Sequence, residues 1–314
     1  MARKAPGKHF REGMSLIEMM RMFPDDSTAE QWFIEQRWPD GVHCPHCGSD
    51  NVQTGTKHKT MPFRCREKEC AKRFSVRTGT VMQASKLGFQ VWILAMYLLM
   101  TSLKSVSSMK LHRDLEITQK SAWHLAHRLR ETMKGSDDLF AGPVEVDETF
   151  VGGRERNKHS CKKLNAGRGG VGKTAVVGAK DRATNRVTAK VVKSTDRNTL
   201  QGFVRDNAEP GATIYTDDFP SYRGMIDFEH KAVKHSVGEY VKDQIHTNGV
   251  ESFWSMLKRA HKGTFHQMSP KHLERYVAEF ADKHNIRELD TIEQMRQIAH
   301  GMIGKKLEYA DLIS

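Results

Sequence analysis

Four of the five cysteines of this chain lie between positions 44 and 70, in two local pairs. Cys44 and Cys47 are separated by two residues, and Cys65 and Cys70 are separated by four. Two such pairs, about one hairpin apart, are typical of a tetrahedral zinc site in which each pair closes a tight turn. The spacing predicts a zinc ribbon over residues 41–82 that holds one structural Zn²⁺.

The second cysteine pair is wider than the usual spacing of two residues, so His43 or His46 remains an alternative ligand. A site closed by four protein ligands leaves no open position for a substrate. We therefore expect the zinc to stabilise a small DNA-binding fold and to take no part in chemistry.

The charge balance of the chain is strongly basic. With 50 Lys and Arg against 38 Asp and Glu, its 314 residues carry a formal net charge of +12. Such a surface attracts polyanions, of which nucleic acid is the commonest; a merely basic protein is the alternative. No secretory leader is visible, and the longest apolar run, 91–100, is too short to span a bilayer. Since clustered metal-binding cysteines suit a reducing compartment, the sequence predicts a cytoplasmic protein with no membrane partner.

The residues outside the ribbon in the first half of the chain show helical periodicity. The sequence predicts an N-terminal helical segment over residues 1–40, with a helix that Ser27 or Thr28 can cap. Residues 86–136 contain three helical runs in the order expected of a helix-turn-helix, and Thr118 can cap the third. That third helix would present Lys120 and His124 to base edges. A plain helical linker is the alternative.

The residue pattern changes from helical to strand-like after Pro143. The stretch VEVDETFV alternates between apolar and polar residues, and TAVVGAKD and RVTAKVVKS flank RATN as a hairpin would. Helical runs follow near positions 197 and 250. This pattern predicts an α/β domain over residues 140–290 and a C-terminal tail over 291–314.

Three carboxylates in this second half stand where secondary-structure elements can bring them together. Asp147 lies inside a strand, Asp217 ends another strand, and Glu251 begins a helix. Phosphodiester chemistry needs two divalent ions, and hard Mg²⁺ or Mn²⁺ prefers such oxygen ligands. Asp218 is adjacent to Asp217, and only one of the two can face the site; we favour Asp217. Glu251 alone could also serve only the helix dipole.

Five stretches of the sequence carry a resemblance to the IS1595-type (ISXO2-like) family of bacterial insertion-sequence transposases, from about Arg37 to Asn285. These stretches are RWPDGVHCPHCGS, RFSVRTGTVMQASKL, VEVDETFVGG, YTDDFPSY and HTNGVESFWSMLKRAHKGTFHQMSPKHLERYVAEF. The resemblance implies a zinc ribbon followed by a ribonuclease-H-like DDE catalytic domain.

The family's three acids fall on Asp147, Asp217 and Glu251, and a lysine of the family falls on Lys258, where it would touch a DNA phosphate. The same motif includes Trp254 and also His246, Asn248 and Arg259, for which we expect site support or DNA contact.

The activity that the resemblance implies is DNA transposition. The protein would bind the terminal inverted repeats of its element, cut the DNA with the help of two Mg²⁺ or Mn²⁺ ions, and transfer the freed 3′-hydroxyl to target DNA. Because two DNA ends are handled together, we expect a homodimer or a higher oligomer on DNA. The alternative function is a non-catalytic zinc-ribbon DNA-binding regulator.

Residues 167–174, GRGGVGKT, match the phosphate-loop pattern of nucleotide-hydrolysing proteins. A phosphate loop needs a buried strand before it and a helix after it. Here a polar basic stretch precedes the octapeptide and a strand pattern follows it, so we expect no nucleotide. Seven Lys or Arg and one Glu between positions 152 and 173 favour a loop that contacts DNA phosphates through Arg168 and Lys173. A solvated loop without a partner is the alternative.

Overall fold

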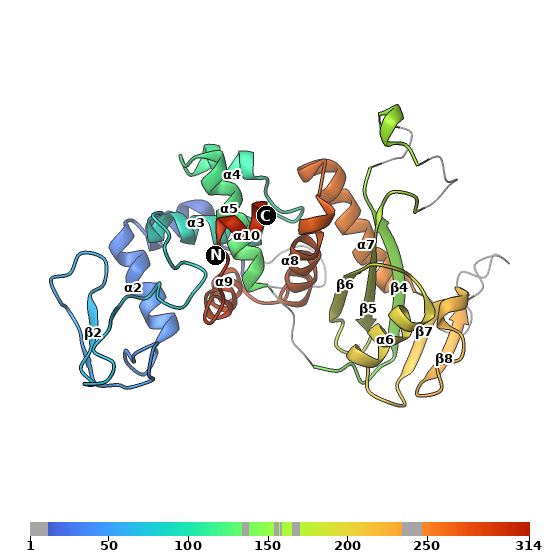
Figure 1. Cartoon of the computed structure of the whole chain (residues 1–314), viewed down its shortest axis with the longest axis horizontal. Helices are drawn as coiled ribbons and strands as arrows, with labels where there is room; N and C mark the ends of the chain where they lie inside the picture. Colours follow the sequence, from blue (N-terminus) through green and yellow to red (C-terminus); the bar gives the residue numbers. More distant parts are fainter. Residues whose placement is uncertain (1–11, 134–137, 154–156, 158, 165–169, 234–246) are drawn as a thin grey trace. The chain divides into compact units, whose positions relative to one another are not determined.

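The computed structural model describes residues 12–133, 138–153, 157, 159–164, 170–233 and 247–314 (Figure 1). The chain divides into two compact units. The first contains Met1–Lys134 together with Arg287–Ser314, and the second contains Gly135–Ile286. None of the helices in the described ranges combines the length and the apolar character that a bilayer crossing requires.

The first unit begins with two helices and a small three-stranded antiparallel sheet of order β1-β2-β3. The elements are α1 (Leu16–Met22), α2 (Asp26–Arg37), β1 (Val52–Gln53), β2 (Phe63–Cys65) and β3 (Arg73–Phe74). The ring of Trp38 packs edge-on against Phe63 and Phe74, which gives this sheet an aromatic core. The predicted cap of α2 was wrong: Asp25 caps the helix by accepting the Thr28 N–H at 2.8 Å.

Three helices follow the sheet in the predicted order, namely α3 (Phe89–Thr101), α4 (Ser108–Asp114) and α5 (Gln119–Thr132). Thr118 caps α5, as predicted, because its hydroxyl accepts the Ser121 N–H at 3.1 Å. The segment predicted as a tail instead forms α9 (Thr291–Gly301) and α10 (Tyr309–Ile313) of the same unit. Its apolar residues explain this: Met295, Ile298 and Leu312 are buried.

The second unit is built on a five-stranded mixed sheet of order β6-β5-β4-β7-β8. Its strands are β4 (Val144–Val151), β5 (Thr174–Asp181), β6 (Val187–Val192), β7 (Thr213–Asp217) and β8 (Glu229–Val233). Strands β4, β5 and β6 pair antiparallel, and the RATN turn joins β5 to β6 as predicted. Strands β7 and β8 run parallel to β4.

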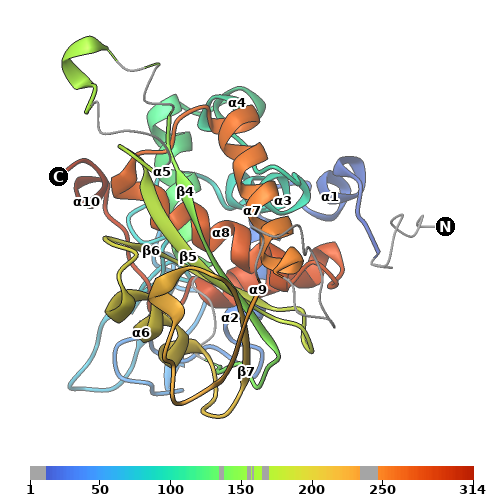
Figure 2. The same ribbon diagram turned by 90° about the vertical axis from the view of Figure 1, so that its right-hand side faces the viewer.

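Helices cover both faces of this sheet (Figures 1 and 2). On one face, α6 (Arg197–Asn207) buries Leu200 and Val204 against Val144 and Val146 of β4. On the other face, α7 (Asn248–Ala260) and α8 (Leu273–Asn285) form a core with Val151, Val176 and Val187. Because strand side chains alternate between faces, β4 contributes even-numbered residues to the α6 core and odd-numbered residues to the α7 side.

Short elements complete the second unit. They are η2 (Ser160–Lys162), η3 (Pro220–Tyr222), the π-helical segment η5 (His261–Phe265) and η6 (Pro270–His272). In both views η2 lies away from the sheet. Strand β5 begins at Thr174, directly after the GRGGVGK stretch, so a strand stands where a phosphate loop requires a helix.

Candidate functional site

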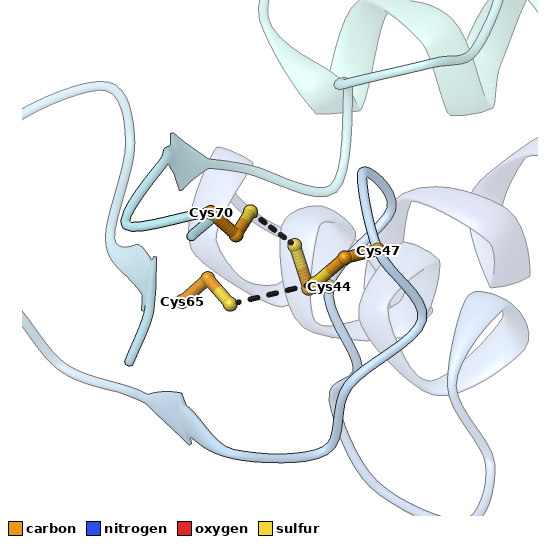
Figure 3. Close-up of side chains that lie close together, drawn as sticks. All are labelled: Cys44, Cys47, Cys65 and Cys70. Atoms are coloured by element: carbon orange, nitrogen blue, oxygen red, sulfur yellow. Dashed lines mark hydrogen bonds between the residues drawn. The ribbon is translucent and has the colours of Figure 1, made fainter. Parts of the chain in front are cut away.

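The four clustered cysteines converge, as predicted (Figure 3). Their sulfur atoms all lie within 4.8 Å of one another, with 3.7 Å between Cys44 and Cys70 and 3.6 Å between Cys47 and Cys65. A tetrahedral site with Zn–S bonds of about 2.3 Å has sulfur–sulfur edges of about 3.8 Å. The cluster therefore has the dimensions of a four-thiolate zinc site.

The wide second pair reaches this geometry through a turn. Cys65 ends β2, and the backbone N–H of Cys70 donates to the Glu67 carbonyl at 3.1 Å, which folds Cys70 back toward the first pair. The four thiols suffice for a zinc ion, so neither His43 nor His46 is needed as a ligand. Burial, followed by the neighbouring thiols, raises the pKa of Cys65 to about 12, and a bound cation would favour its thiolate form.

Asp147 and Asp217 lie side by side on the α7 face of the sheet. The parallel pairing of β4 with β7 sets Val144 opposite Ile214 and Glu145 opposite Tyr215. If this register is continued by two residues, Asp147 falls opposite Asp217 on the face of Glu145 and Tyr215, and the charge of Asp217 does act on Asp147. The middle of β4 and the carboxyl end of its parallel neighbour β7 thus bring both acids to one place.

The environment of Asp147 raises its pKa to about 7. Burial is the largest cause, and the negative charges of Glu148, Asp217 and, more weakly, Glu251 add to it. The other two acids expected from the sequence, Asp217 and Glu251, therefore both act on Asp147 through their charges. They do not form a group as tight as the cysteines, which are the one set of three or more metal-binding side chains within 4.8 Å in the described residues.

The adjacent acids Asp217 and Asp218 differ in their surroundings. Asp217 is half-buried, and its carboxylate accepts the Phe219 N–H at 3.2 Å. Asp218 is exposed and pairs with the Arg223 guanidinium at 3.1 Å. Only Asp217 is among the charges that act on Asp147. The structure thus places Asp217 at the site and turns Asp218 toward a surface partner.

Glu251 stands in the first turn of α7 and is exposed. The hydroxyl of buried Thr247 donates to the Glu251 carboxylate at 2.9 Å, and the Glu251 N–H donates to the Thr247 carbonyl at 3.0 Å. Thr247 therefore orients the third acid. Lys258 lies two helical turns further along α7 and is also exposed, so the two side chains project from the same side of the helix.

The other candidate DNA contacts in the second unit fall in different surroundings. Arg259 is exposed, with its guanidinium bonded to Ser255 of the preceding turn. Lys173 is half-buried and lines a groove with Phe150 and Lys193. Arg168 lies outside the described residues.

Lys120 and His124 on α5 contact the C-terminal segment, which the sequence did not suggest. The Lys120 ammonium lies over the Tyr309 ring, 4.2 Å from its centroid. His124 is half-buried, its Nε2 is 3.1 Å from the Leu307 carbonyl oxygen, and its ring packs edge-on against Tyr309. Lys120 stays exposed, whereas His124 does not face outward as predicted, because the segment around Leu307 covers it.

Two further residues near the acids were given no role from the sequence, and a third, Trp254, was expected only to support the site or to contact DNA. Glu148 follows Asp147 and points to the opposite face, where the buried Tyr222 hydroxyl donates to it at 3.0 Å. Glu145 is 2% exposed and forms an ion pair with Arg182 at 2.7 Å. The Trp254 indole N–H donates to Asp147 Oδ2 at 3.0 Å. The only local sign of these contacts was the run of closely spaced acids in VEVDE, because the hydrogen-bond or ion-pair partner of each residue lies far away in the sequence.

Two family models match this chain. The one described as an ISXO2-like transposase domain matches residues 140–285, and the one described as a transposase zinc-ribbon domain matches residues 24–73. The second match includes the cysteine cluster, so the ribbon is a zinc-binding domain whose four thiols fit one Zn²⁺.

Individual proteins are also similar to the chain. A protein from Halobacterium salinarum, described as an uncharacterized protein in transposable element ISH50, is 28% identical over 253 residues, which cover 76% of this chain and 84% of that protein. A chain in the cryoEM structure of the simian T-cell lymphotropic virus intasome with PP2A regulatory subunit B56 gamma is 14% identical, with a TM-score of 0.29. That alignment covers 61% of this chain and 65% of the other, and it is too distant to support an argument about the fold. On the two matched domains and the transposable-element relative, the chain belongs to the IS1595-type (ISXO2-like) transposase family.

Proposed function

We propose that the protein is a DDE transposase that binds the terminal inverted repeats of its element, cleaves the DNA there and joins the freed 3′-hydroxyl to target DNA. The observation that carries the proposal is that Asp147 and Asp217 stand on neighbouring parallel strands, with Glu251 on the helix that covers this sheet face, and that the charges of Asp217 and Glu251 act on Asp147. The transposase family membership is the second support.

We also infer that the second unit is a ribonuclease-H-like domain. Its sheet combines three antiparallel strands with two parallel ones in the order β6-β5-β4-β7-β8, and helices pack on both faces. The acids stand on the central strand, on its parallel neighbour and on a covering helix, which supports the arrangement that the family resemblance implies.

The acids fit Mg²⁺ or Mn²⁺ by their chemistry. All donors in the set Asp147, Asp217 and Glu251 are carboxylate oxygens, the ligands that hard divalent cations prefer. The raised pKa of Asp147 shows that burial and like charges disfavour its ionised form, which a bound cation would relieve. When bound, two such ions would supply activation of the attacking oxygen and charge stabilisation of the leaving oxygen.

The remaining groups of the chain would position the DNA. Lys258, two turns from Glu251 on the same side of α7, would hold a phosphate beside the acids, with Arg259 next to it. Lys173, Arg168 and the exposed Lys120 are further candidate phosphate contacts, and the net charge of +12 supports a polyanionic partner. No covalent intermediate with the enzyme is required, and pairing of two DNA ends favours a homodimer or higher oligomer on DNA.

The test is DNA cleavage at the element's own ends. A labelled duplex with one terminal repeat is incubated with the protein in Mg²⁺ or Mn²⁺, and the released 3′-hydroxyl strand is measured. The wild type should cut, and Asp147→Ala and Glu251→Ala should not, although both should still bind the duplex. Cutting by either variant would refute the three-acid assignment. Binding without cutting by the wild type would favour a zinc-ribbon DNA-binding regulator.

A further inference from the structure

Helix α7 is attached to the central strand β4 at two points, one on either side of Glu251 in the sequence. At the first point, the Val250 N–H donates to buried Glu145 Oε2 at 3.0 Å. At the second, the Trp254 indole N–H donates to Asp147 Oδ2 at 3.0 Å. Because Glu251 lies between Val250 and Trp254, both contacts bear on where its carboxylate stands.

The two contact points are separated by nearly the same distance along strand β4 and along helix α7. Glu145 and Asp147 are two residues apart on one strand face, a distance of about 6.6 Å along the strand. Val250 and Trp254 are four residues apart, a rise of about 6 Å along the helix. The helix therefore runs in register with the strand, and a slip by one helical residue would break both contacts.

Two glycines allow the helix to approach this closely. A Cβ at Gly249 would lie 2.7 Å from Glu145 Oε2, and a Cβ at Gly178 would lie 2.7 Å from the Trp254 ring. Gly178 is the β5 residue directly opposite Asp147 in the antiparallel ladder. The indole thus crosses Gly178 to reach Asp147, and any side chain at position 178 would displace it.

The two side chains that make these contacts, Glu145 and Trp254, are held in place by their own neighbours. Glu145 is held by the Arg182 ion pair at 2.7 Å, and Arg182 stacks on the Tyr215 ring, 4.3 Å from its centroid. Trp254 is 3% exposed and packs against Phe253 in the α7 core. Neither group can follow a shift of the helix without losing buried contacts.

We propose that Glu145 and Trp254 are positioning residues that clamp α7 to β4 and so set the distance between Glu251 and Asp147. The inference rests on the proposed function, since it assigns these residues to the site formed by the three acids. The Trp254 donor also occupies Asp147 Oδ2 in a defined direction, as outer-shell partners of metal ligands do.

The test uses variants that break the clamp in two ways. Trp254→Phe keeps a buried aromatic ring but removes the N–H donor together with part of the ring volume. Gly178→Ala keeps the donor and pushes the ring away. Gly202→Ala on α6 is the matched control, because a Cβ there meets nothing within 4 Å. Mn²⁺ binding by the full-length protein is measured by electron paramagnetic resonance without DNA, alongside the Mg²⁺ concentration that gives half-maximal cleavage.

Outer-shell changes typically weaken metal binding by about 10- to 100-fold. We expect at least about tenfold weaker Mn²⁺ binding for Trp254→Phe and Gly178→Ala, a matching rise in the Mg²⁺ requirement, and wild-type values for Gly202→Ala. Glu145→Gln keeps an acceptor for Val250 and should bind Mn²⁺ more tightly than Glu145→Ala.

Failure of the clamp and failure of the proposed function are distinguishable. If the wild type binds Mn²⁺ and cuts DNA, and both clamp variants do so with unchanged metal dependence, the clamp is refuted while the transposase assignment stands. If the wild type neither binds Mn²⁺ nor cuts, the proposed function itself fails. Circular dichroism at the assay temperature confirms that each variant is folded, so a loss of binding by an unfolded variant is not counted.

Discussion

Replacing Asp147 by Asn should stabilise the metal-free protein, increasingly so as pH rises. Asp147 is held among other carboxylates, and its pKa is raised from the ordinary 3.8 to about 7, first by burial and then by Glu148 and Asp217. Asn keeps the shape and an acceptor for the Trp254 N–H but carries no charge. The substitution therefore removes the electrostatic penalty and leaves the packing nearly intact.

The sign follows from proton linkage. Between pH 3.8 and about 7 the folded state holds a proton on Asp147 that the unfolded state has released, so stability falls as pH rises through this window. At 1.36 kcal/mol per pH unit, the full penalty is about 4 kcal/mol, of which about 2.5 kcal/mol develops between pH 5 and pH 8. The Asp147→Asn variant has no titrating group at this position, so it does not lose this stability as pH rises.

The assay is calorimetric unfolding of both proteins in Mg²⁺-free buffer that leaves the ribbon's zinc in place. For a unit of this size, 1 kcal/mol corresponds to a shift of about 2–4 °C in Tm. The advantage of Asp147→Asn in Tm should therefore grow by about 5–10 °C from pH 5 to pH 8. Added Mg²⁺ should raise the Tm of the wild type alone. An advantage that is constant with pH, or that shrinks, would show that the ionised Asp147 carboxylate does not destabilise the folded protein.

Three further predictions concern other parts of the chain. The purified protein should contain one zinc per chain, and a strong chelator should unfold the ribbon; no zinc, or a far-ultraviolet spectrum that the chelator leaves unaltered, would contradict the four-thiol site. The double variant Arg168→Ala/Lys173→Ala should bind DNA more weakly and with a salt dependence flattened by about one to two counterions; equal affinity would favour a loop without a partner. Tyr222→Phe removes a donor to Glu148 and should destabilise the protein by about 1–2 kcal/mol in urea unfolding; an unchanged midpoint would show that this hydrogen bond contributes nothing.

The sequence predicted those parts of the fold that depend on local spacing. The two cysteine pairs close turns within a few residues, and their convergence is confirmed. The strand over VEVDETFV and the strand that begins at Thr174 are confirmed for the same reason, since both were predicted from a period of two. Thr118 likewise caps α5, because a cap needs only the next three residues.

The parts that escaped prediction depend on partners far apart in the chain. Trp254 and Asp147 are 107 residues apart, and nothing in either segment states that one will bond the other. The burial of His124 under the segment around Leu307 spans 183 residues and reverses the outward orientation that helical periodicity suggested. Local pattern fixes which face a side chain takes on its own element, while tertiary packing decides what covers that face.

Strand transfer by a DDE site centred on Asp147 and Asp217 can be tested with a matched pair of neighbouring acids. Asp217→Asn and Asp218→Asn are compared with the wild type for joining a labelled transposon end to target DNA in Mg²⁺. The wild type and Asp218→Asn should form joined products, because Asp218 faces Arg223 and away from the site, whereas Asp217→Asn should form none. Joined product from Asp217→Asn, or its loss in Asp218→Asn alone, would contradict the account.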